Sequence, residues 1–142
     1  MKNVILILFI ALVSCSGSDD TPPTNIVENL IGKWSLTNYG KWPEGNFGYD
    51  NDEIIWEFQQ NGTLTITISE TAELHPDMYF QTSGIYECST WVSGQSNEYN
   101  NLTISSMPDT LGYRFGLNGE LYLVHEDPTD GNSYWYDFER ID

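Results

Sequence analysis

Positively charged residues are scarce in this sequence. Lys and Arg together number 5 among 142 residues, against 21 Asp and Glu, so the formal net charge is −16. A folded domain with this balance cannot neutralise a row of phosphates, which excludes nucleic acids and anionic lipid headgroups as partners of the folded part. Aromatic residues make up 14% of the chain, and this content indicates a packed core rather than a disordered acidic tail.

The sequence also lacks the motifs of common enzyme active sites. It has no Gly-x-Ser-x-Gly, no His-Glu-x-x-His and no Gly-rich phosphate loop. Its two histidines are His75, which precedes Pro76 in a long loop, and His125. With 21 carboxylates some must lie close together, so paired acids do not indicate acid–base catalysis. The sequence therefore predicts a protein that is not an enzyme.

Long hydrophobic runs are limited to one, and it is too short to span a bilayer. Val4–Val13 has 10 residues, whereas a spanning helix needs about 20. After the positive start at Lys2, this run is typical of a signal peptide. The next residues, Leu12-Val13-Ser14-Cys15, resemble the lipobox of bacterial lipoproteins. This resemblance implies that residues 1–14 are a cleaved signal peptide and that the Cys15 thiol carries a diacylglyceryl group. The alternative is an ordinary signal peptide that contains a cysteine by chance.

Residues 15–26 are predicted to be the lipidated cysteine and a flexible tether. Cys15–Asp20 resembles the acidic export signal of surface lipoproteins in some diderm bacteria, and Thr21–Thr24 contains two prolines that keep the chain extended. Removal of Lys2 with the signal peptide leaves four positive residues against 21 acidic ones, a net charge of −17. The expected location is the outer membrane, at the cell surface, with the lipid as the only attachment of a monomeric protein.

Residues 27–142 have the pattern of a β domain. A short helical turn is expected at Val27–Ile31, and no segment shows helical periodicity over ten residues. Asn61-Gly62 and Asn118-Gly119 are typical of type I′ hairpin turns, with positive φ at both positions. Period-two alternation occurs in eight segments: Trp34–Tyr39, with Trp34, Leu36 and Asn38 on one face, then Ile54–Gln59, Thr63–Ile68, Phe80–Cys88, Leu102–Ile104, Leu111–Leu117, Leu121–His125 and Tyr134–Phe138. The prediction is an all-β, eight-stranded antiparallel up-and-down barrel, with a two-sheet sandwich as the alternative.

Several short motifs in this domain resemble the small lipocalin-like domains of bacterial lipoproteins. They are Gly32-Lys33-Trp34, Asn61-Gly62-Thr63-Leu64, Gly84-Ile85-Tyr86, Leu102-Thr103-Ile104 and Tyr134-Trp135-Tyr136-Asp137-Phe138-Glu139-Arg140. In lipocalins the first Trp plugs the closed end of the barrel, and an Arg from a late strand stacks across it. The resemblance therefore implies that Trp34 is the plug and that Arg140 closes over it.

The inward face of this barrel is expected to be rich in aromatic rings. The set is Trp34, Trp56, Phe58, Tyr86, Tyr113, Phe115, Tyr134, Tyr136 and Phe138. An eight-stranded barrel is just wide enough to be filled by side chains or to hold one small ligand. A filled barrel makes these rings a solid core. A hollow one makes Trp56, Phe58, Tyr86, Tyr113, Phe115, His125 and Tyr136 a pocket for a small apolar or amphipathic ligand.

Loop residues suggest a second kind of function. Trp42, Phe47 and Tyr49 lie in a Gly-rich segment, and Trp91 lies near the next long loop. Such aromatic residues either contact a glycan or an envelope protein, or fold over the barrel end and are buried. The lone thiol of Cys88 is expected to be a small core residue.

Cofactors are not expected. Asp50–Glu53 and Glu126–Gly131 are dense in oxygen atoms, and calcium is the one cofactor that they would suit. Pro128 breaks the EF-hand pattern of the second run, and turn formation accounts for both runs.

Overall fold

The structure, a computed structural model, describes residues 27–78, 81–89, 100–107, 109–126 and 131–141. The expected signal peptide and tether, with Cys15, and Trp91 lie outside these ranges. The regular elements are the 3-10 helix η1 (Glu28–Leu30) and the strands β1 (Gly32–Lys41), β2 (Gly45–Gly48), β3 (Ile54–Phe58), β4 (Thr63–Ile68), β5 (Gly84–Ser89), β6 (Asn100–Ile104), β7 (Thr110–Phe115), β8 (Leu121–Glu126) and β9 (Ser133–Arg140). None of the helical structure in these ranges is long and apolar enough to cross a membrane.

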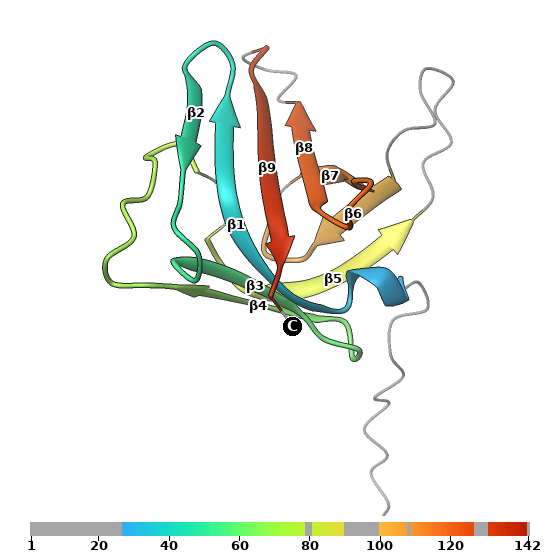
Figure 1. The fold of residues 1–142 in the computed structure, drawn as a ribbon. Coiled ribbons are helices and arrows are strands. Elements are labelled where there is room, and N and C mark those ends of the chain that lie inside the picture. Colours follow the sequence, from blue (N-terminus) through green and yellow to red (C-terminus); the bar gives the residue numbers. More distant parts are fainter. Residues whose placement is uncertain (1–26, 79–80, 90–99, 108, 127–130, 142) are drawn as a thin grey trace, which may run out of the picture.

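The strands form one closed antiparallel barrel. Each strand from β3 to β8 pairs with the next one in sequence, and β9 pairs with β1 to close the cylinder. Figure 1 shows β2, β1, β9 and β8 side by side, with β3 to β7 completing the wall. The predicted eight-stranded up-and-down barrel is confirmed, and the sandwich alternative is wrong. Closure removes the long exposed edges that an open sheet of these strands would have.

β1 has two different partners along one of its edges. Its first half pairs with β3 and its second half with β2, while β9 follows its other edge. The register with β9 shifts between Leu36 and Asn38, as in a β-bulge. This extra residue turns Tyr39 and Lys41 inward, where both are buried. The prediction that Asn38 continues the inward face of Trp34 and Leu36 is therefore wrong.

Two hairpins have the expected glycines but a different turn. Gly62 and Gly119 have φ of 83° and 90°, whereas Asn61 and Asn118 are not among the positive-φ residues. In the first hairpin the Gln59 N–H donates to the Thr63 carbonyl at 2.9 Å, and the Gly62 N–H donates to the Gln59 carbonyl at 3.0 Å. This is the pattern of a longer loop that ends in a left-handed glycine, so the predicted type I′ geometry is wrong.

Candidate functional site

One end of the barrel is closed by Trp34 and Arg140. The buried Trp34 indole Nε1 donates to the Leu30 carbonyl of η1 at 2.8 Å, and the Arg140 guanidinium lies 5.2 Å from the centre of the indole ring. Arg140 also donates to the carbonyl oxygens of Ile31 at 2.7 Å and Asn29 at 3.4 Å. The structure thus brings together the two residues that the lipocalin resemblance paired, and η1 covers this end.

The interior holds the aromatic rings that the alternation placed inward. Eight of the nine are at most 2% exposed, and Phe115 is half-buried beside Trp34 at a ring distance of 5.9 Å. The centre of the Trp56 ring lies 5.1 Å from that of Phe138 and 6.1 Å from that of Phe58. Separations of this size mean rings in contact. Phe115 packs against the buried core, to which five residues of the candidate pocket belong: Trp56, Phe58, Tyr86, Tyr113 and Tyr136.

Polar groups within this core are held in their neutral forms. The Tyr86 hydroxyl donates to the Gln59 carbonyl at 2.9 Å, and burial raises its pKa to about 12. Burial likewise raises the pKa of Tyr113 and of Cys88, whose side chains hydrogen-bond to each other. A thiol that stays protonated is a poor nucleophile, which fits the expectation that Cys88 is a small core residue.

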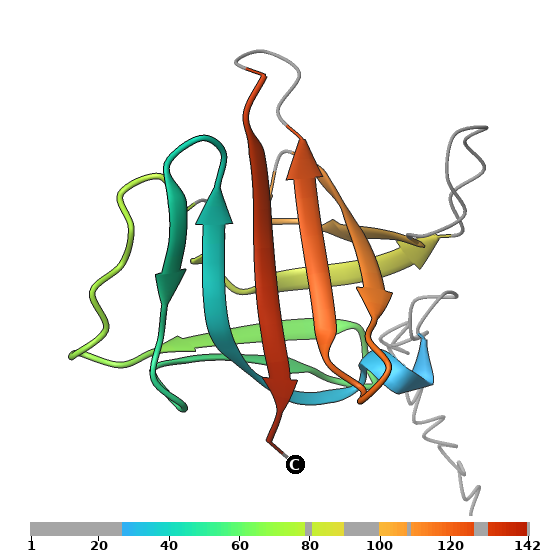
Figure 2. The same cartoon turned by 45° about the horizontal axis from the view of Figure 1, so that its top comes forward.

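The opposite end of the barrel is covered by the loop that follows β4, residues 69–78. Figure 2 shows this loop and the β1–β2 hairpin on the side of the barrel away from η1. Lys41, on the inner face of β1, binds Asp77 of the loop at 2.6 Å and Glu44 of the hairpin turn at 2.7 Å. The Tyr39 hydroxyl donates to the Asp77 carbonyl at 3.3 Å. The hairpin and the loop are therefore tied to each other through Lys41.

His75 completes this group of charges. Its ring lies 4.2 Å from that of Phe47, its Nδ1 accepts the Asp77 N–H at 3.3 Å, and its Nε2 lies 3.4 Å from Glu44. We call Lys41, Glu44, His75 and Asp77 the clasp. The hydrogen bonds that the Lys41 ammonium donates to Asp77 and to Glu44 raise the pKa of Lys41, with Asp77 the larger cause, and the bond from Lys41 lowers the pKa of Asp77. Each of the four residues thus lies beside a group of opposite charge or a complementary hydrogen-bonding group.

Three residues of the clasp have side chains of the kinds that bind metal ions. One donor atom each from Glu44, His75 and Asp77 lies within 4.8 Å of the other two. The Lys41 ammonium already bridges the two carboxylates, at 2.6 and 2.7 Å. Since a divalent cation in this position would lie against an ammonium group, the geometry fits a clasp better than a metal site.

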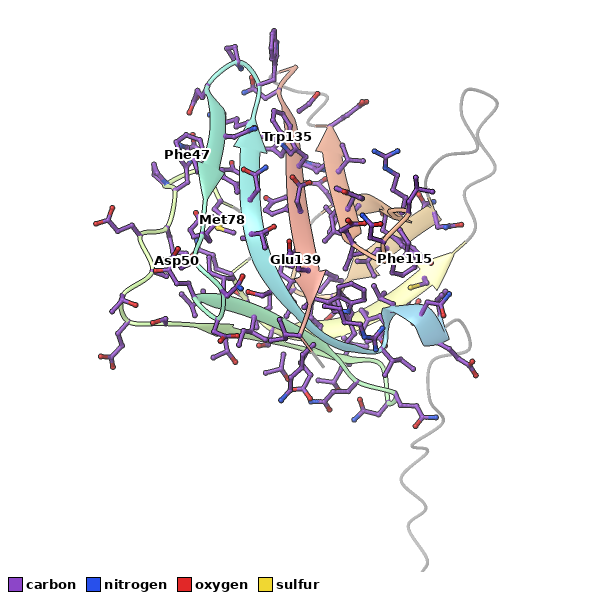
Figure 3. The ribbon with its side chains drawn as sticks, in the orientation of Figure 1. Phe47, Asp50, Met78, Phe115, Trp135 and Glu139 are labelled. Carbon is purple, nitrogen blue, oxygen red and sulfur yellow. The ribbon has the colours of Figure 1, made fainter. Side chains whose placement is uncertain are left out.

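The predicted surface aromatics divide into two groups. Trp42, in the turn after β1, is 66% exposed. Phe47 and Tyr49 are half-buried, because Phe47 packs on His75 and the Tyr49 hydroxyl lies 3.8 Å from the Met78 sulfur. Figure 3 shows Phe47 and Met78 beside β2. Both alternatives therefore apply: Trp42 is presented to solvent, and the other two help to cover the barrel end.

His125 lies inside the barrel wall and is nearly buried. It is 6% exposed, its ring stacks on Tyr134 at 5.9 Å, and its Nε2 lies 3.6 Å from an Asp109 carboxylate oxygen. The Lys41 ammonium lies 6.0 Å from the centre of the same Tyr134 ring. His125 therefore packs against Tyr134, whose ring also lies beside Lys41 of the clasp.

The acidic run at Asp50–Glu53 forms a turn. The Asp50 N–H donates to the Glu53 carboxylate at 2.9 Å, the Asp52 N–H donates to the buried Ser35 hydroxyl at 3.0 Å, and Asp52 has a φ of 69°. These bonds give the run a structural role without a cation. Residues 127–130 of the second acidic run lie outside the described residues.

Sequence reasoning missed Trp135 as a surface feature. Its indole lies over Gly40 of β1, so that a Cβ at Gly40 would be 1.9 Å from the ring. Figure 3 shows Trp135 near the hairpin end of the barrel. A glycine inside a strand often marks such a close approach, and that was the available signal.

Comparison with known proteins does not assign the chain to a family. No protein-family model matches it, and no curated protein matches it.

Proposed function

We propose that this protein is a lipid-anchored accessory protein of the bacterial cell envelope, which contacts a partner protein through the β1–β2 hairpin end of its barrel. The lipobox resemblance supports lipidation at Cys15 and attachment to the outer membrane. Eleven residues, from Ser16 to Ile26, would reach roughly 35 Å if fully extended, which is enough to clear the headgroups. Together these features support a domain that faces outward and is free to meet other envelope proteins.

The packing of the barrel favours a surface function over an internal one. Trp34, Arg140 and η1 cover one end, and the clasp and the loop 69–78 cover the other. Between the two ends the rings are in contact, as in the pair Phe58 and Tyr86, whose centres are 4.9 Å apart. A ligand inside this barrel would have to displace core side chains.

The observation that carries the proposal is the exposure of Trp42 on a fixed support. Its side chain is 66% exposed. It directly follows Lys41 and lies two residues before Glu44, and both of these belong to the clasp. Its N–H donates to the Ser133 carbonyl at 2.9 Å, which fixes the backbone against β9. A rigidly held, exposed Trp is a frequent energetic centre of protein interfaces.

Photo-cross-linking in intact cells tests this assignment. A photoreactive amino acid at position 42 is expected to give one defined protein adduct in the native host. Position 117 is the matched control, because Leu117 is 106% exposed and lies in the β7–β8 turn near the other end. Equal adducts at both positions, or no adduct at position 42, would contradict the proposal.

The expected internal ligand is the second candidate, and the buried hydroxyls of Tyr86 and Tyr113 are the groups that would orient it. Native mass spectrometry of the Cys15→Ser variant, which lacks the lipid, separates the two. The filled barrel predicts a mass equal to that of the polypeptide and no uptake of a hydrophobic dye. A co-purifying small molecule would favour the ligand-binding function instead.

Anchoring is tested separately from binding. The Cys15→Ser variant is expected to lose radiolabelled palmitate and to leave the membrane fraction, because the thioether needs the thiol sulfur. A Cys88→Ser variant is the control and should keep the label, since that thiol is buried. Label that persists in Cys15→Ser would refute the lipid anchor.

A further inference from the structure

β2 has a second edge that no described strand covers. Within the described residues it pairs only with β1. The Tyr49 N–H donates to the Thr37 carbonyl, so these two residues form a hydrogen-bonded pair of the ladder. The pair of Tyr39 and Phe47, two positions along, is of the same kind. In an antiparallel ladder the alternate residues point their backbone groups away from the partner. The N–H and C=O groups of Asn46 and Gly48 therefore face outward.

These outward groups are accessible and unprotected. Asn46 and Gly48 are exposed, and no described residue donates to or accepts from their backbone groups. Natural edge strands are usually blocked by Pro, Lys or a covering segment. β2 is short, with four residues, but its sequence, Gly-Asn-Phe-Gly, contains neither Pro nor Lys. The strand thus offers two donors and two acceptors in a row.

The edge is also fixed in place. Phe47 packs on His75, and Tyr49 contacts Met78 of the same loop. The clasp holds the start of β2 through Glu44. A strand that is already ordered loses little entropy when another strand joins it, which favours binding.

The surroundings of this edge are acidic. Glu44 precedes β2, the exposed Asp50 follows it, and the exposed Glu73 is two residues from the His75 that packs on Phe47. Figure 3 shows Asp50 at the end of β2. The nearby cation, Lys41, is already paired with Glu44 and Asp77. A second copy of this chain, with its net charge of −16, would be repelled, whereas a basic segment would be attracted.

We propose that the partner is an extended basic segment of another protein, which adds to the outer edge of β2 as an extra strand. Its backbone pairs with Asn46 and Gly48, its Lys or Arg side chains lie beside Glu44, Asp50 and Glu73, and Trp42 contacts an apolar residue at its end. Main-chain pairing supplies affinity in this mode and the charges supply selectivity. This inference rests on the proposed function, and it names the chemistry of the partner.

The test uses the full-length protein in a non-ionic detergent and a synthetic peptide that alternates Lys and Val. We expect saturable binding by NMR titration, with the largest amide shifts at Asn46 and Gly48. A peptide in which Pro replaces each Val keeps the charge but cannot pair as a strand, and its binding should be at least tenfold weaker. Raising the salt from 50 to 500 mM should weaken binding of the Lys-Val peptide, because part of the attraction is between charges.

Two substitutions at one position provide the matched variants. Gly48→Ala keeps the outward N–H, and its Cβ would meet only the Thr37 carbonyl at 3.9 Å, so binding should be retained. Gly48→Pro removes the donor and should lower affinity at least tenfold. If Gly48→Pro fails to fold, the position of the shifts in the unaltered protein decides. Shifts located elsewhere, or equal binding of the Pro peptide, would overturn strand addition, while a cross-link at position 42 would still support the proposed function.

Discussion

A Trp→Ala substitution in the barrel interior tests whether the barrel is filled. Trp56 is fully buried, and its ring contacts those of Phe58, Phe138 and Tyr136. Removing the indole from a packed site costs the transfer energy of the ring and adds the cost of the cavity left behind. For buried Trp→Ala the sum is about 3–5 kcal/mol. If the barrel were hollow, the ring would border an existing space and the cavity cost would be absent.

The size of the effect can be measured by thermal or urea unfolding. In a domain of this length, 1 kcal/mol corresponds to roughly 4 °C in Tm, so Trp56→Ala should lower Tm by about 12–20 °C. Trp42→Ala is the matched control, because the same side chain is 66% exposed there and its loss should cost no more than about 0.5 kcal/mol. Unfolding should remain measurable, since domains of this size have about 5–15 kcal/mol of stability.

Free indole, added to the Trp56→Ala variant, tests whether the substitution leaves a cavity. The cavity of Trp56→Ala should bind free indole, and at ten times its Kd this would restore about 1.4 kcal/mol, or roughly 6 °C in Tm. The unaltered protein should show no such shift. If Trp56→Ala costs less than about 1 kcal/mol, or if indole stabilises the unaltered protein to the same extent, the filled barrel is refuted.

Two further predictions concern the hairpin end. Gly40→Ala places a Cβ 1.9 Å from the Trp135 ring, so it should cost about 1–3 kcal/mol and shift Trp emission to the red. In a Trp135→Ala background the same change should cost almost nothing, and an additive result in unfolding measurements would contradict the close packing. The stability lost in Asp77→Asn should be present at pH 7, begin to decline below pH 3.8, the ordinary pKa of Asp77, and vanish as the pH falls through the folded pKa, which Lys41 lowers. It should also begin to decline above pH 10.5 and vanish only as the pH passes the folded pKa of Lys41, which is raised above this ordinary value; a loss that is constant from pH 3 to 12 would argue against the ion pair.

The barrel could be predicted from sequence because one face of each strand is buried in the core and the other is not. Apolar residues alternate along segments such as Trp56–Phe58 and Tyr134–Phe138 because every second side chain is buried. Burial of these side chains is also what favours a closed barrel. The β-bulge after Leu36 could not be predicted, because nothing local distinguishes an extra residue from continued alternation. It moved Lys41 inward, against the rule that charged residues stay outside, and the carboxylates of Glu44 and Asp77 compensate its burial.

The clasp could not be predicted from the sequence for a related reason. Lys41 and Asp77 are 36 positions apart and meet only because the loop 69–78 folds over the barrel end. In the sequence His75 is marked only by its place in a long loop, yet its ring packs on Phe47. Such pairings depend on tertiary placement, which a single sequence does not encode in any local pattern. The Trp34 and Arg140 pair was different, since a family resemblance supplied the tertiary relation.

The unprotected edge of β2 follows from the geometry of β1. β1 is the longest strand, and β9 pairs along almost its whole length to close the barrel. Along the other edge of β1, β3 pairs only with Gly32–Ser35. The chain before β3 turns away from β1 at residues 50–53. The second half of β1 would then be an open edge of the barrel itself. β2 covers it, and the exposed edge is moved outward to a short hairpin tied by the clasp, where a partner strand can bind without opening the core.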